Sequence, residues 1–150
     1  MRRAFRIAAI LLVSMAVAGT LGATAWAVPR SRRGRYRAVF QQAWSRALCA
    51  VLRIRVDVVG KPPDPGEEWL AVSNHLGYAD ILVLGSVLPV AFVSKSEVAR
   101  WPLVGFLAAL GGTEFVDRED RRSAGRFAER LAGRISSGDR ILVFPEGTST

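Results

Sequence analysis

The longest apolar stretch lies near the N-terminus, where residues 7–28 contain no charged side chain. A helix of that length spans about 33 Å at roughly 1.5 Å per residue, which is enough to cross the hydrocarbon core of a bilayer. The stretch therefore predicts a membrane anchor. The preceding arginines and Ala25-Trp26-Ala27 also resemble a cleaved signal peptide, and a helix that enters the membrane without crossing it is a third alternative.

Beyond the anchor, patterns typical of helices alternate with patterns typical of strands. Helices are predicted over residues 36–52, 80–88, 101–110 and 119–137, and strands over 53–59, 69–73, 90–94, 114–117 and 141–144. Such alternation indicates an α/β domain with a largely parallel sheet flanked by helices. We expect an anchor with basic flanks at 1–35 and one domain at 36–150.

Two of these helices leave their environment open, and a third has a charged face. Residues 36–52 carry a large apolar residue at every fourth position, which fits a helix on the membrane or one covering the core. The segment 101–110, with Pro102 expected in its first turn, fits a helix at the membrane that guides an acyl chain, or a core helix. In 119–137, Arg122, Arg126, Arg130 and Arg134 lie opposite the apolar face and predict a solvated stripe.

Positive charge is concentrated at the N-terminal end. Residues 1–37 hold eight arginines and no acidic residue, whereas the thirteen basic and thirteen acidic residues of 38–150 balance. A nucleic-acid-binding domain would spread its basic residues over a folded face, so this class is disfavoured. The distribution fits a segment that flanks a membrane with anionic head groups. The five arginines after the stretch favour a domain on the cytoplasmic side of the cell membrane.

Polar residues follow three of the predicted strands. Asn74 and His75 with Asp80 follow one, Asp117-Arg118 another, and Glu146-Gly147-Thr148 a third. The carboxyl ends of parallel strands meet at one edge of a sheet, where ligands bind, so we expect these clusters together. One histidine and one cysteine cannot close a zinc site, and Cys49 is expected to be an apolar filler.

His75 and Asp80 are candidates for a catalytic pair. Histidine is the usual general base near neutral pH, and a carboxylate partner fixes its tautomer. Five residues of regular helix would turn about 500°, so the pair requires a bent connection, for which Gly77 offers an unusual backbone conformation. A structural role is the alternative for a lone histidine.

The ordered combination of Asn74-His75-x4-Asp80, Phe115-Val116-Asp117-Arg118 and Phe144-Pro145-Glu146-Gly147-Thr148 is more specific. Over residues 50–150 it resembles the glycerolipid acyltransferase family of the lysophosphatidic acid acyltransferase (PlsC-like) type. The resemblance implies a glycerol-phosphate acyltransferase-like fold behind an N-terminal membrane helix. It also implies transfer of a fatty acyl group from acyl-CoA or acyl-carrier protein to a lysolipid hydroxyl in phospholipid biosynthesis, without a bound cofactor.

The resemblance assigns roles to residues. His75 would be the general base, oriented by Asp80. Asn74, Asp117, Arg118, Glu146, Gly147 and Thr148 would bind the acceptor, with Arg118 meeting an anion through its planar fork, or instead forming a surface ion pair. Lys95 would contact the oxyanion or the donor, or instead pair with Glu97.

Two departures from the family pattern bear on the acceptor and on the extent of the chain. Ser149 stands where many members carry arginine after Pro-Glu-Gly-Thr. The expected acceptor is 1-acyl-glycerol-3-phosphate, with another lysolipid such as lyso-ornithine lipid as the alternative, and a non-catalytic membrane or exported lipid-binding module as a further one. Family members are longer, so we expect a domain that is incomplete at its C-terminus.

Overall fold

The structure, a computed structural model, describes residues 2–64, 69–117 and 121–145, with side chains except those of residues 2 and 121–124. Its centre is a parallel sheet of four short strands in the spatial order β1, β4, β2, β3. The strands are β1 (Leu70–Val72), β2 (Ala91–Lys95), β3 (Glu114–Val116) and β4 (Ile141–Val143). The predicted α/β class with a parallel, helix-flanked sheet is confirmed.

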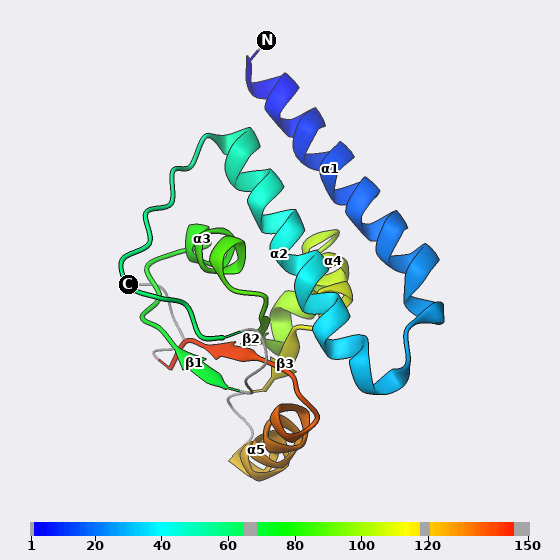
Figure 1. Cartoon of the computed structure of the whole chain (residues 1–150), viewed down its shortest axis with the longest axis vertical. Coiled ribbons are helices and arrows are strands. Elements are labelled where there is room, and N and C mark those ends of the chain that lie inside the picture. The colour runs from blue at the N-terminus through cyan, green and yellow to red at the C-terminus, as the bar shows by residue number, and fades with distance from the viewer. Residues whose placement is uncertain (1, 65–68, 118–120, 146–150) are drawn as a thin grey trace.

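Helices cover both faces of this sheet, as Figure 1 shows, with α5 (Arg121–Ser136) on one face and α3 (Ala79–Val87) and α2 (Arg33–Leu52) on the other. Because successive strand residues point to opposite faces, neighbouring residues of β2 enter different cores. Phe92 packs with Leu142 and Phe144 on the α3 side. Val93 packs with Val116 and Ile141 beneath α5.

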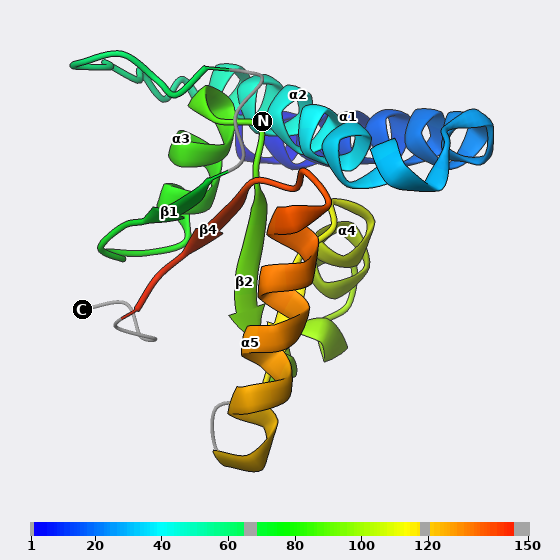
Figure 2. The ribbon, with the colours of Figure 1, turned by 60° about the horizontal axis from the view of Figure 1, so that its bottom comes forward.

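The two N-terminal helices form an antiparallel pair. The helix α1 (Arg2–Thr24) continues into η1 (Ala25–Ala27), and η2 (Arg30–Arg32) leads directly into α2. Trp44 of α2 donates its indole N–H to the buried hydroxyl of Ser14, at 3.0 Å. The hydroxyl groups of Thr24 and Tyr36 hydrogen-bond near the turn. These contacts place α1 along α2, which runs over the domain in Figure 2.

The helix α2 covers the domain core, one of the two alternatives left open by its sequence. Its buried side is in contact with α3 and β2. Gln42 donates to the carbonyl of Val87 at 2.8 Å, and Arg46 donates to that of Ser86 at 2.8 Å. These side chains satisfy carbonyl groups that the end of α3 would otherwise leave without partners.

Residues 53–59 were expected to form a strand, and this prediction is wrong. Arg53 takes a left-handed conformation (φ 59°) that ends α2, and residues 54–59 form no regular element. The segment then runs past α3, with a groove of about 330 Å³ between the two, and does not join the sheet. Val59 is fully exposed. Among the residues that the structure describes, this alternating segment has no neighbouring strand to pair with.

The segment after β2 also differs from its prediction. A 3-10 helix, η3 (Ser96–Arg100), comes first, and α4 (Val104–Leu110) begins two residues after Pro102. Pro102 therefore lies in the turn before the helix. Gly111 and Gly112 end α4 as expected, with Gly112 at φ 84°.

Gly105 fixes how closely α4 approaches η3. A Cβ atom at this position would lie 2.3 Å from the carbonyl oxygen of Ala99. We predict that Gly105→Ala lowers the free energy of unfolding by about 2 kcal/mol, because backbone atoms cannot move aside as a flexible side chain can. Gly125 of α5 faces open space, so Gly125→Ala should instead raise it by about 0.5–1 kcal/mol. Urea unfolding of the detergent-solubilised chain measures the free energy of unfolding of both variants. Equal changes in the two variants would contradict the close packing of α4 on η3.

Candidate active site

The turn between β1 and α3 is built around the carboxylate of Asp80. Its Oδ2 atom accepts hydrogen bonds from the backbone N–H of Leu76 at 2.6 Å, the backbone N–H of Gly77 at 3.0 Å and Nδ1 of His75 at 3.0 Å. The backbone N–H of Asp80 donates back to the carbonyl of Gly77 at 3.0 Å. The predicted pairing of His75 with Asp80 across a bent connection is thus present in the structure.

The bend does not arise in the way expected from the sequence. The backbone of Gly77 is not in the left-handed region, and a Cβ atom there would meet nothing within 4 Å. The turn instead closes because one carboxylate gathers three donors from the preceding residues. Asp80 also lies in the first turn of α3, where the helix dipole favours negative charge.

The imidazole of His75 is held on a second side by an aromatic ring. Phe144, directly after β4, stacks on it with ring centroids 4.2 Å apart and planes inclined by 25°. Phe144 stacks in turn near Phe92 of β2, at 6.2 Å. The backbone N–H of Ser73 extends the pairing of β1 with β4 by donating to the carbonyl of Val143 at 3.1 Å. This hydrogen bond holds the segments after the two strands close together. The imidazole therefore keeps one position relative to the sheet.

This geometry determines which nitrogen of His75 can act as a base. Nδ1 faces a carboxylate, so in the neutral ring Nδ1 carries the proton and Nε2 carries the lone pair. The side chains of His75 and Asp80 remain 17% and 24% exposed, so neither is sealed in the core. A neutral imidazole oriented by a carboxylate is the arrangement that general-base catalysis requires.

The pKa of Asp80 lies below its ordinary value. Partial burial acts to raise this pKa, but the hydrogen bonds from Gly77, Leu76 and His75 and the charge of a protonated His75 together lower it. The carboxylate is therefore ionised throughout the neutral range and remains an acceptor for all three donors.

The other predicted site residues are placed only in part. Asn74 is exposed next to His75, and Asp117 directly follows β3, on the edge where the strands end. Lys95 ends β2 and is exposed. Within the described residues it forms no ion pair with Glu97. Arg118, Glu146, Gly147 and Thr148 lie outside the described residues.

Sequence reasoning missed two features of the site. The stacking of Phe144 on His75 was not expected, although Phe144 opens one of the quoted motifs. The backbone donors Leu76 and Gly77 were also missed. The position of Asp80 could have indicated them, since an acidic side chain in the first turn of a helix can reach back to a backbone N–H at the helix start.

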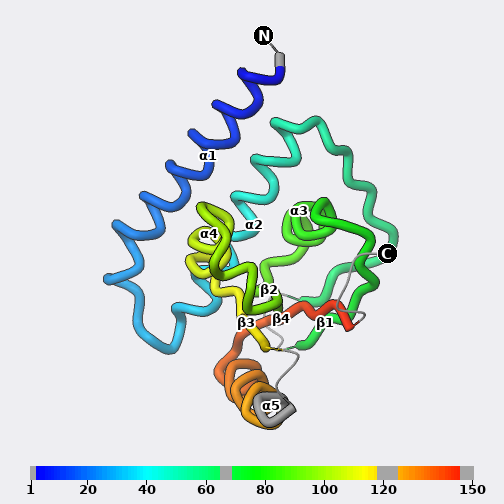
Figure 3. The backbone as a smooth tube through the Cα atoms, turned by 180° about the vertical axis from the view of Figure 1, so that it is seen from behind, coloured from blue at the N-terminus to red at the C-terminus, as the bar shows by residue number. Residues whose placement is uncertain are grey.

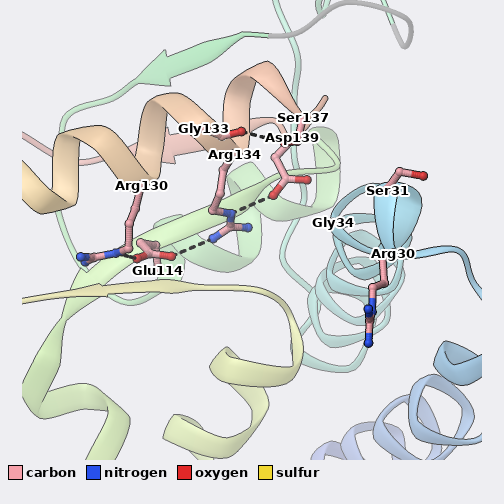
Figure 4. A pocket seen from close by; sticks show the side chains of 9 residues that line it. All are labelled: Arg30, Ser31, Gly34, Glu114, Arg130, Gly133, Arg134, Ser137 and Asp139. Carbon is pink, nitrogen blue, oxygen red and sulfur yellow. Dashed lines mark hydrogen bonds and ion pairs between the residues drawn. The ribbon is translucent and has the colours of Figure 1, made fainter.

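A charged cavity of about 470 Å³ opens at the opposite edge of the sheet, away from His75. Figure 4 shows Arg134 between Glu114 and Asp139, to which it donates at 3.2 and 2.8 Å, while Arg130 donates to Glu114 at 2.9 Å. The prediction of a solvated arginine stripe agrees with the 50% exposure of Arg130 but is wrong for Arg134, whose side chain is only 23% exposed. The network ties α5 to β3 and to the start of β4.

Comparisons with known proteins place the chain in a family. The Acyltransferase family profile matches residues 55–150. The lyso-ornithine lipid O-acyltransferase of Rhizobium meliloti is 41% identical over 107 residues, which are 71% of this chain and 36% of that protein. The 1-acyl-sn-glycerol-3-phosphate acyltransferase of Neisseria meningitidis is 29% identical over 81% of this chain and 46% of that protein. The chain thus spans less than half the length of these relatives.

A solved structure shares the fold. The 1-acyl-sn-glycerophosphate acyltransferase PlsC from Thermotoga maritima matches all of this chain and 64% of its own length, with a TM-score of 0.69 and 20% identity. The fold and the family profile together define an acyltransferase domain of the α/β class. The chain belongs to the acyltransferase family, as its sequence motifs predicted.

The lowered pKa of Asp80 makes a prediction about acid stability. A carboxylate with a lowered folded pKa contributes stability fully above its unfolded pKa, near 3.8, and loses that contribution as pH falls through the folded pKa. We expect Asp80→Asn to be less stable than the wild type by a constant amount at neutral pH. That gap should narrow below pH 3.8. Urea unfolding at a series of pH values measures this difference in stability. A difference that stays unchanged below pH 3.8 would contradict the hydrogen bonding of Asp80.

Proposed function

We propose that this chain carries the catalytic base of a lysolipid O-acyltransferase. The observation that supports it most is the hydrogen bond between Nδ1 of His75 and the carboxylate of Asp80, which leaves Nε2 as a base. Membership of the acyltransferase family supports the same reaction class. The co-substrates would be a lysolipid acceptor and an acyl thioester, either acyl-CoA or acyl-carrier protein.

In the proposed reaction, Nε2 of His75 takes the proton from the acceptor hydroxyl as its oxygen attacks the thioester carbonyl. The C–S bond then breaks, and the thiolate leaves as a thiol after taking a proton from the imidazolium. The products are an ester and a free thiol. Asp80 stabilises the transient imidazolium and remains ionised, as the low pKa of its carboxyl requires.

Lyso-ornithine lipid is the acceptor that the comparisons favour. The lyso-ornithine lipid O-acyltransferases of Rhizobium meliloti and Pseudomonas aeruginosa are 41% and 42% identical to this chain, whereas the 1-acyl-sn-glycerol-3-phosphate acyltransferase of Neisseria meningitidis is 29% identical. Ser149 also favours lyso-ornithine lipid, because an arginine at that position would add a cation for an acceptor phosphate. The second candidate acceptor is 1-acyl-glycerol-3-phosphate.

A membrane location fits the substrates and α1. One helix, Arg3–Ala27, is long and apolar enough to cross a bilayer by length and composition, a test that a signal sequence also passes. The Trp44–Ser14 hydrogen bond supports a helix retained with the domain. Because α2 also packs on α3 and β2, a retained α1 would lie against the domain, as a helix that enters one leaflet. The five arginines that follow the apolar stretch are the reason to propose the cytoplasmic side for the domain.

Replacing the base tests the mechanism. His75→Ala should lower acyl transfer from labelled acyl-CoA or acyl-carrier protein by about 10²–10⁴-fold, because a positioned general base contributes rate enhancements of this size. The control variant is Glu129→Gln, which changes an exposed side chain on α5. Circular dichroism of each variant checks that it is folded. Normal turnover by a folded His75→Ala variant would exclude His75 as the base.

The acceptor is tested by a panel of lysolipids that includes lysophosphatidate and lyso-ornithine lipid. We expect faster transfer to lyso-ornithine lipid, for the reasons given by Ser149 and the comparisons. Thioester loss is measured with and without acceptor, because release that is independent of any lysolipid indicates a hydrolase. Strict preference for lysophosphatidate would show that Ser149 does not determine which lysolipid is the acceptor.

A further inference from the structure

An exposed apolar surface lies beside the turn between β1 and α3, which carries His75 and Asp80 and which we call the catalytic turn. It consists of four side chains that are 41–60% exposed, in the turn before α4 and in its first residues: Trp101, Leu103, Val104 and Phe106. We call these residues the α4 patch. Gly105 is the fully buried residue of α4, and Leu107, Ala108 and Leu110 are half-buried, so α4 packs on the domain at its surface. No charged residue occurs from Trp101 to Thr113. Apolar surfaces of this kind mark sites of interaction.

The backbone within the α4 patch is strained. Leu103 has φ 62° and ψ −52°, and the N–H of Val104 donates to the carbonyl of Pro102 at 2.6 Å, which closes a γ-turn of the rare kind. Such conformations are unfavourable for leucine and occur mainly at functional positions. Here the strain presents an apolar side chain to the outside, where it contributes little to the core.

The α4 patch lies on an element that contacts α1, the longest apolar helix of the molecule. Figure 3 shows α4 against the α1–α2 pair. Phe5, Leu12 and Met15 of α1 are exposed. Arg100 directly precedes the patch, and Trp101 begins it. Arginine and tryptophan are the side chains that favour the boundary between head groups and acyl chains. A phospholipid bilayer is therefore the partner that this surface fits.

The α4 patch also reaches the catalytic turn. The rings of Trp101 and Tyr78 are 6.0 Å apart, and Tyr78 lies between His75 and Asp80 in the chain. Tyr78 and Leu76 are 71% and 68% exposed. A lipid surface in contact with the patch would thus adjoin the residues that carry the catalytic pair.

We propose that the α4 patch is a second lipid-contacting surface, distinct from α1, which inserts Leu103, Val104 and Phe106 among the acyl chains. The catalytic turn then lies at the level of the head groups, where a lysolipid hydroxyl is found. The insertion does not depend on acyl-transfer activity, so it can be tested independently of the proposed function.

Site-directed fluorescence tests the insertion with the full chain. Cys49 is replaced by alanine, a single cysteine is introduced by Phe106→Cys, and an environment-sensitive fluorophore is attached. The matched variant carries Glu129→Cys on the exposed side of α5. Vesicles of phosphatidylcholine and phosphatidylglycerol contain lipids with spin labels on their acyl chains. We expect the probe at 106 to shift to shorter wavelength and to be quenched severalfold more than the probe at 129.

Two results would overturn the proposal. One is equal quenching at 106 and 129 in vesicle-bound protein, which would mean that α1 alone contacts lipid. The other is a shift of the probe at 106 that grows with protein concentration in the absence of vesicles, which would mean that a second copy covers the patch.

A pair of leucine variants provides an independent measurement. Leu103 and Leu70 are exposed to almost the same extent, 47% and 45%, but Leu70 lies in the edge strand β1. Leu103→Ser should lower the vesicle partition coefficient by about tenfold, since removing one inserted aliphatic side chain changes partition by about that factor. Leu70→Ser should leave it unchanged. Equal partition of both variants would also overturn the proposal.

Discussion

One carboxylate organises the end of this molecule that holds the candidate catalytic pair. Asp80 gathers two backbone N–H groups and one imidazole on a single oxygen, and this forces the chain between β1 and α3 into its bend. The same three donors keep the carboxyl ionised, so the geometry and the charge of the site have one origin. Phe144 then fixes the other side of the imidazole from the neighbouring strand. The imidazole of His75 is therefore positioned by two segments that lie far apart in the sequence.

The rest of the fold makes this meeting possible. Because β1 and β4 are adjacent and parallel, the residues that follow them leave the sheet at the same edge. Helix α2 secures α3 by binding the carbonyl groups at its C-terminal end, so α3 presents its N-terminal end to the site. At the opposite edge, Arg134 ties α5 to Glu114 and Asp139. The sheet is short, and these polar contacts hold its helices in place on both faces.

Much of this could be predicted from the sequence, and the exceptions have physical causes. The helices and four of the five strands followed from periodicity, and the His75–Asp80 pairing followed from residue type and spacing. Residues 53–59 have the pattern of a strand, but a strand also needs a partner, which is a property of the whole chain. The ion pairs of Arg130 and Arg134 were missed because Glu114 and Asp139 approach them only through the sheet topology. The strain at Leu103 arises from a γ-turn, for which the sequence offers no clear signal.

The central claim is that the carboxylate of Asp80 fixes the tautomer of His75. Because His75 is the only histidine, its two ring nitrogens can be observed without assignment by nitrogen-15 NMR of labelled protein at a pH where the ring is neutral. We predict that Nδ1 carries the proton in the wild type and that Asp80→Asn shifts the population toward protonated Nε2. A wild-type ring that is protonated at Nε2, or one whose tautomer is the same in both proteins, would contradict this account.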